Sequence, residues 1–212
     1  MKNLLLIGLL SIMFSFESVA QKKELKYASD VANLKEQLKT DSILRFEYAC
    51  ALEFHKYLND YRTSRKLKPL RWNDTLWVVA MNHGIYLNEN DLFSHEQIAR
   101  KSLFSGVQPG NRYNFVVQSK QNIAGYGENL FMTSFYNLNT PAHHALEAFN
   151  AWKKSPGHNK NMLYKSFDEH GTAVVSGESS LIFTDFFFMN NPTLKERKRK
   201  FSFGFHRKRK SK

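Results

Sequence analysis

Apolar residues recur every three or four positions in three stretches of the chain, which is the pattern of amphipathic helices. One helix is expected from Ser42 to Arg62. A second, capped by Asn73 or Asp74, is expected to run to about Asn88, and a third begins where Thr140 and Pro141 form its cap and first position. The predicted inward faces are Phe46, Cys50, Phe54, Tyr57 and Tyr61, then Leu76, Val79, Ala80, His83 and Leu87, and finally Ala145, Leu146, Phe149 and Trp152.

The remaining segments have extended or irregular patterns. Leu67 to Trp72 is expected to be extended around Pro69, because proline disfavours helix in the residue before it. Residues 91–126 are interrupted by glycine, proline and asparagine, which predicts a long structured loop. Such loops in compact domains are usually functional.

The C-terminal half of the pattern predicts a helix end followed by a hairpin. Ser155 and Pro156 are expected to stop the third helix, and residues 159–163 to add a short turn. Residues 169–176 and 181–189 are expected to form a hairpin whose strands are joined around 177–180.

The N-terminal residues have the composition of an export signal. A basic start at Lys2, an apolar run from Leu4 to Phe16 and a small-residue exit ending at Ala20 predict a signal peptide over residues 1–20. No later segment reaches the roughly 20 apolar residues of a transmembrane helix. The mature protein is therefore expected to be secreted or periplasmic. Residues 21–47 are polar and lysine-rich, and predict a frayed leader or a short helix that packs on the domain.

The net charge of +12 is concentrated in one place. From Lys195 to Lys212 there are ten Lys or Arg against one Glu, which contributes +9. A block of like charges at this density is expected to be disordered over residues 191–212. With its interleaved phenylalanines, this tail is expected either to hold the protein on an anionic surface or to be a solvated extension. Nucleic acid is the disfavoured anion for an exported protein.

The chain contains a single cysteine, Cys50, so it forms no intrachain disulfide. Its place on an apolar helix face predicts a buried, inert thiol rather than a nucleophile.

Two strings of residues carry a family resemblance. Asn122 to Leu130 reads NIAGYGENL, and Trp152 to Leu163 reads WKKSPGHNKNML. A Phe-Ser-His step ends at His95, a strand carries His170, and an aromatic strand runs from Ile182 to Phe188. In this order the five pieces resemble the CAP superfamily of cysteine-rich secretory, antigen 5 and pathogenesis-related 1 proteins, in its compact, disulfide-free bacterial form. The resemblance covers about residues 48–190.

The resemblance implies a fold and a site. The fold is α+β, a three-layer α-β-α sandwich around a mainly antiparallel sheet. The family's central cleft gathers histidines and acidic residues, and it maps onto His95, Glu128 and His170. The fourth position departs from the animal pattern, because Lys153 and Lys154 stand where those members have a glutamate. His158 in Ser-Pro-Gly-His is taken as the fourth cleft residue.

The resemblance also implies a metal, since the cleft histidines bind a divalent ion in several members. His95 and His170 would supply two nitrogen ligands for zinc or another divalent metal, and Glu128 would orient one histidine or hold a water. Two protein ligands are fewer than the three of a typical catalytic zinc, and His158 would be a third. Alternatively, His158 and His170 only hydrogen-bond the backbone of the cleft loops.

Other candidate residues carry weaker signals. His143 and Glu147 lie four residues apart on a helix and could bind one metal ion together. We expect instead that they lie on a solvated face of that helix. His83 is expected to be a packed core histidine. Ser94 lacks the strand-turn-helix elbow of a serine hydrolase, and no His-Glu-x-x-His motif is present.

Two functions follow from the resemblance. The favoured one is a secreted, non-enzymatic binding module that holds a divalent metal or a small lipid, sterol or glycan. The alternative is a metal-assisted, peptidase-like hydrolase with the metal on His95 and His170 and with Glu128 as general base. The sequence leaves the ligand and the oligomeric state open.

Overall fold

The computed structural model describes residues 24–121, 123, 125–134 and 140–189. The predicted signal peptide and the basic tail lie outside the described residues, so both stay predictions.

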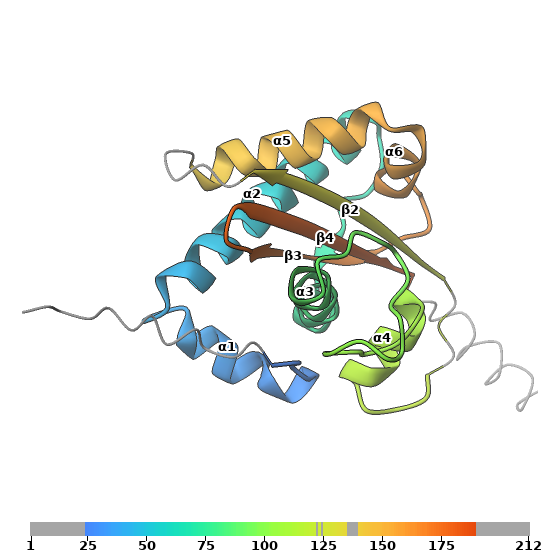
Figure 1. Cartoon of the computed structure of the whole chain (residues 1–212). Coiled ribbons are helices and arrows are strands. Elements are labelled where there is room, and N and C mark those ends of the chain that lie inside the picture. The colour runs from blue at the N-terminus through green and yellow to red at the C-terminus, as the bar shows by residue number, and fades with distance from the viewer. Residues whose placement is uncertain (1–23, 122, 124, 135–139, 190–212) are drawn as a thin grey trace, which may run out of the picture.

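A four-stranded sheet forms the middle layer (Figure 1). Its strands are β1 (Arg71–Trp72), β2 (Tyr126–Ser134), β3 (Glu169–Ser176) and β4 (Ser180–Phe188), in the spatial order β1-β3-β4-β2. The pairs β2–β4 and β3–β4 are antiparallel, and β1 pairs with β3 in parallel. This arrangement confirms the predicted α+β sandwich with a mainly antiparallel sheet.

One face of the sheet is covered by α2 (Ser42–Ser64) and α5 (Pro141–Lys154), with the short α6 (Pro156–Met162) beyond the end of α5 (Figure 1). The core between these helices and the sheet contains the fully buried Phe54 and Phe183. Both long helices begin where the sequence predicts: Thr140 caps α5, and Asp41 accepts hydrogen bonds at the start of α2.

The other face is covered by α3 (Asp74–Glu89), which is flanked by α1 (Val31–Gln37) and α4 (Pro109–Val116) (Figure 1). The Asn73 side chain accepts hydrogen bonds from the first free amides of α3, as predicted for its cap. Every residue of α3 from Leu76 to Leu87 is buried, because the helix is enclosed by the sheet and these neighbours.

Gly171 lets α3 lie directly on β3. A Cβ at this position would be 2.1 Å from the Trp77 backbone nitrogen. Only a residue without a side chain fits such an approach. Because Gly171 faces α3, its strand neighbour His170 must face α2, and this alternation decides the composition of the site described below.

The structure corrects several details of the predicted elements. The predicted long loop contains the helix α4, whose proline, glycine and asparagines hide its helical pattern. Leu146 is 42% exposed rather than inward. The predicted turn after Pro156 is part of α6, because Pro156 begins a helix as well as ending the previous one. Of the two alternatives for the N-terminal segment, the described part shows a short packed helix: α1 carries Leu34, which is buried in the same cluster as residues of α3.

No helix in the described parts of the chain combines the length and the apolar character that crossing a bilayer requires.

Candidate functional site

Glu128 is the centre of a charged cluster on the α3 face of the sheet. Strand β2 places it opposite Phe186, which in turn pairs with Gly171, so the three residues point to the same face. The residue is only 7% exposed. One carboxylate oxygen accepts from the His95 Nδ1 at 2.9 Å, and the other accepts from the Arg112 guanidinium. The predicted pairing of His95 with Glu128 is therefore present.

Arg112 is the fully buried cation beneath the cleft. It projects from α4, and its Nη1 donates to the backbone oxygens of His95 and Val107 at 3.0 Å each. One guanidinium thus holds both the Glu128 carboxylate and the loop that presents His95. Sequence reasoning missed this residue, because a lone arginine in a polar segment carries no signal of burial.

His83 lies under the same carboxylate. Its side chain is buried, its Nε2 is 3.6 Å from Glu128 Oε1, and the same nitrogen is 3.0 Å from the Ser94 oxygen. A carbonyl only accepts, so Nε2 carries the proton and Nδ1 accepts from the Gln97 amide at 3.1 Å. The predicted core histidine is indeed buried, but it also supports the cleft. Together with Gln97 it fixes the loop around Ser94.

Burial and the Arg112 charge determine the protonation states of His83 and Glu128. Burial lowers the pKa of His83 to about 4, so it is neutral near pH 7. Burial raises the pKa of Glu128, but the charges of His83 and Arg112 and the hydrogen bonds from His95 and Arg112 outweigh it and lower the pKa overall. Since His83 is neutral near pH 7, Arg112 is the charge that keeps Glu128 ionised there.

His95 and His158 are the cleft groups that remain accessible. The His95 side chain is 52% exposed, and its bond to Glu128 uses Nδ1, so this bond does not occupy Nε2. His158, in α6, is partly buried, and its backbone oxygen accepts from Asn129 at 3.2 Å. Burial, and then the charge of His95, lower the pKa of His158, so the two imidazoles lie within electrostatic reach of each other.

His170 does not belong to this cluster, which corrects the predicted cleft and the predicted metal pair. Its side chain points to the α2 face, whereas His95 and Glu128 lie on the α3 face. The reason is the alternation of β3, which sends consecutive residues to opposite sides of the sheet. His95 and His170 cannot share one ion across the sheet.

His170 instead links the sheet to α2. Its Nδ1 is 2.9 Å from Asp185 Oδ1 and its Nε2 is 2.7 Å from His55 Nδ1. The ring planes of His55 and His170 are nearly parallel, at 14°. A carboxylate, a buried imidazole and a second imidazole thus form one hydrogen-bonded chain. Burial, and then the charge of His170, lower the pKa of His55 to about 4. The alternative interpretation, in which His170 only forms hydrogen bonds, agrees better with the structure. The partners of His170 are side chains, however, and not the backbone groups expected.

The remaining candidates occupy the expected places. His143 and Glu147 are both about half-exposed on α5 and 3.8 Å apart, as expected for a solvated face. Cys50 is fully buried, and burial raises the pKa of its thiol to about 12, which fits the predicted inert thiol. Lys153 and Lys154 are exposed at the end of α5. The Ser94 hydroxyl accepts from the Glu96 amide at 3.1 Å.

The chemistry of the cluster favours recognition over proton abstraction. Both Glu128 oxygens are already paired, so this carboxylate is placed to orient His95 rather than to take a proton. Within the described ranges there is no group of three or more His, Cys, Asp or Glu side chains with metal-binding geometry. What these residues offer a ligand is the exposed imidazole of His95, with His158 within electrostatic reach.

Solved structures with the same fold include an extracellular protein containing a SCP domain from Bacillus anthracis str. Ames. It is 22% identical, with a TM-score of 0.57 over 71% of this chain, and the match spans only 44% of that longer protein. An outer surface protein from Borrelia burgdorferi is 22% identical, with a TM-score of 0.51 over 65% of this chain and 90% of that one. No curated protein sequence matches the chain.

The cysteine-rich secretory protein (CAP) family matches residues 55–189. This segment includes the whole sheet and every residue of the cluster around Glu128. Because the match covers more than half of the 212 residues, the chain belongs to the CAP family.

Proposed function

We propose that this CAP-domain protein is an exported binding module, whose cleft uses His95 and His158 to contact a small ligand. The observation that carries the proposal is the state of Glu128. Its two oxygens are held by His95 and Arg112, so the carboxylate fixes the tautomer and orientation of His95. An imidazole held this way presents a defined hydrogen-bonding edge, which is a feature of a recognition site.

The alternative, a metal-assisted hydrolase, has less support. A general base needs an oxygen that is free to accept a proton, whereas Glu128 is paired on both sides and its pKa is lowered. The predicted zinc pair does not fit either, because His95 and His170 lie on opposite faces of the sheet. His95 and His158 together give two ligands, one fewer than a catalytic zinc usually takes.

Export is the second part of the proposal. The basic, apolar and small-residue segments that end at Ala20 have the order of a signal peptide, which cleavage after Ala20 would remove. N-terminal sequencing of the protein released by an expressing bacterium tests this directly. A mature chain that begins at Gln21 is expected, and a chain that retains residues 1–20 would contradict export by this route.

The cleft is tested by comparing His95→Ala with His143→Ala in the full chain. Both imidazoles are 52% exposed, so the second variant is a matched control for the loss of a surface histidine. Thermal shifts are measured with neutral and acidic oligosaccharides and with vesicles of phosphatidylglycerol. At least one probe should stabilise the wild type and His143→Ala but not His95→Ala.

Hydrolysis is measured on the same proteins with casein peptides and p-nitrophenyl acetate. The proposal expects no turnover above the His95→Ala background. Turnover by the wild type that is lost in both His95→Ala and Glu128→Gln would overturn the binding function in favour of the hydrolase. Equal thermal shifts in the wild type and His95→Ala for every probe would show that His95 has no role in ligand binding, and would overturn the proposed site.

A further inference from the structure

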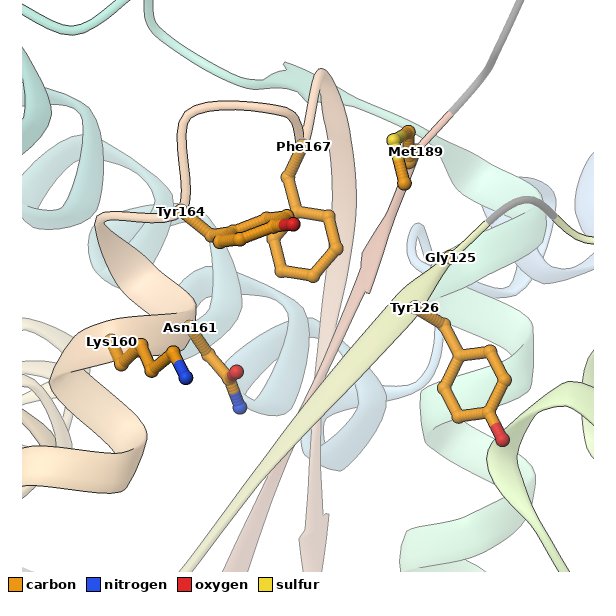
Figure 2. A pocket seen from close by; sticks show the side chains of 7 residues that line it. All are labelled: Gly125, Tyr126, Lys160, Asn161, Tyr164, Phe167 and Met189. Carbon is orange, nitrogen blue, oxygen red and sulfur yellow. The ribbon is translucent and has the colours of Figure 1, made fainter.

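A hollow of about 300 Å³ lies beside the cleft, where β2 begins next to α6 (Figure 2). Lys160 and Asn161 come to it from α6, and Tyr126 comes from β2. Tyr164 and Phe167 follow α6, and Met189 follows the last strand. The volume is at the lower end of the range of small-molecule sites, and suits a ligand the size of one ring.

The hollow combines a fixed aromatic wall with one accessible ring, that of Tyr164. The Tyr126 ring lies on the other side of β2, against Phe186 and α4, so Tyr126 borders the hollow without facing it (Figure 2). Phe167 is 6% exposed and stacks on the core residue Phe187 at 5.5 Å, so the wall cannot shift. Tyr164 packs against Phe167 at 4.8 Å, yet is 41% exposed. An exposed tyrosine with one apolar face and one polar tip suits a ring that is itself apolar on its faces and polar at its edges. A sugar ring has this character.

Asn161 and Lys160 supply the polar groups. The Asn161 Nδ2 donates to the Glu128 backbone oxygen at 3.3 Å and to Asn129 Oδ1 at 2.9 Å, so its amide is held in one orientation. These bonds also join the hollow to the strand that carries the cleft glutamate. Lys160 is exposed, and none of the described lining residues is an Asp or a Glu. The charge of the hollow is therefore positive and suits an anionic group.

The residues that follow the hollow-lining Met189 in the sequence are rich in positive charge, which favours a polymeric anion. The stretch from Lys195 to Lys212, with ten Lys or Arg, follows the lining residue Met189 closely in the sequence. A basic segment attached beside a site attracts a polyanion over a distance but does not read its structure. The tail and the hollow thus have complementary roles, attraction and recognition.

We propose that the hollow binds one acidic sugar residue of an anionic polysaccharide. Tyr164 stacks on the sugar ring, Asn161 contacts a hydroxyl, and Lys160 pairs with the carboxylate. The inference names a ligand class for the proposed binding function and rests on that function, because the hollow adjoins the cleft through Asn161. A phospholipid headgroup is the competing occupant and is included in the test.

The test measures binding of tetragalacturonate to the full chain by isothermal titration calorimetry, with the methyl-esterified tetramer as the uncharged probe. Lys160→Gln should weaken binding about tenfold, the expected effect of losing one charge-assisted hydrogen bond. Lys165→Gln is the matched control. It removes the same charge from an exposed lysine that does not line the hollow, and should change affinity less than about twofold, because solvent screens a charge that makes no direct contact with the ligand.

Two further variants separate recognition from attraction. Tyr164→Leu keeps an apolar side chain against Phe167 but removes the ring, and should weaken binding about fivefold. Replacing the basic residues of the tail by glutamine should weaken binding more at low salt than at high salt, and should leave the Lys160 dependence intact.

The inference is overturned if Lys160→Gln and Tyr164→Leu bind tetragalacturonate as the wild type does, or if the methyl ester binds equally well. It is also overturned if only phosphatidylglycerol vesicles show the Lys160 dependence. The two proposals fail separately. Binding that needs His95 but not Lys160 would retain the cleft and reject the hollow, whereas binding that needs Lys160 but not His95 would do the reverse.

Discussion

Replacing Arg112 by methionine should destabilise the protein by about 3–5 kcal/mol, the usual cost of removing one partner from a buried ion pair. Arg112 is fully buried and is the cation that pairs with the buried Glu128 carboxylate. Its loss leaves Glu128 with one hydrogen bond, from His95, in a site closed to water. It also removes the donors to the His95 and Val107 carbonyls, so the upper part of the range is expected.

Urea denaturation followed by tryptophan fluorescence measures this loss, because Trp77 and Trp152 are 1% exposed and report unfolding of both layers. The control is Arg71→Met. Arg71 pairs with Glu169 at 2.7 Å, but its side chain is 65% exposed, so the expected loss of stability is much smaller than that of Arg112→Met.

The pH dependence checks the cause of the effect. In the wild type the pKa of Glu128 is lowered, so the stability it provides is present above the unfolded pKa and is lost as the pH falls through the folded value. Without Arg112 the buried carboxylate protonates more readily, and the deficit of Arg112→Met should shrink between about pH 7 and pH 5. Adding Glu128→Gln should recover part of the loss at pH 7. A deficit under about 1 kcal/mol, or one that does not change with pH, would refute the reasoning.

Three other predictions follow from single residues. His83 is buried and its pKa is lowered to about 4, so its contribution to the free energy of unfolding is complete above the ordinary pKa of 6.5 and declines as the pH falls toward 4. The decline should be smaller in His83→Asn, and urea midpoints measured across this pH range test it. Cys50, whose thiol pKa is raised to about 12, should resist alkylation by iodoacetamide at about pH 8 until urea unfolds the chain. Mass spectrometry measures the alkylation, and stoichiometric modification of the folded protein would be inconsistent with the burial of Cys50. Gly171→Ala should lower the free energy of unfolding by about 3 kcal/mol or more, because its Cβ would meet the Trp77 nitrogen at 2.1 Å. Gly157→Ala is the control and should be nearly neutral, since a Cβ there has no atom within 4 Å. Equal melting temperatures for the two variants would contradict the close packing of α3 on β3.

Most of the elements were predictable, because helices and strands follow local patterns. The caps at Asn73 and Thr140 and the paired strands after residue 169 are set by neighbouring residues, and all are present. Helix α4 was not predictable from its pattern. Its glycine and asparagines favour turns, and its place is determined by the burial of Arg112 and Val116 against the rest of the protein.

The candidate site was predictable only in part. The order of the Phe-Ser-His and Gly-Glu-Asn strings led to His95 and Glu128, which are paired. Nothing local marks Arg112 or Gln97 as buried partners. The assignment of His170 to the cleft was wrong for a different reason. The residue is on the expected strand, but the face of the sheet to which its side chain points depends on which of its neighbours packs against α3.

By itself the sequence determined the three long helices and the C-terminal hairpin, the absence of an intrachain disulfide and the location of excess charge, because each depends on composition or on neighbours along the chain. The tertiary structure alone decided which polar groups meet. The close contact of Gly171 with α3 sets the face of His170, and the packing of α4 brings Arg112 under Glu128. Contacts between residues distant in the chain depend on strand register and layer packing, and no local pattern carries that information.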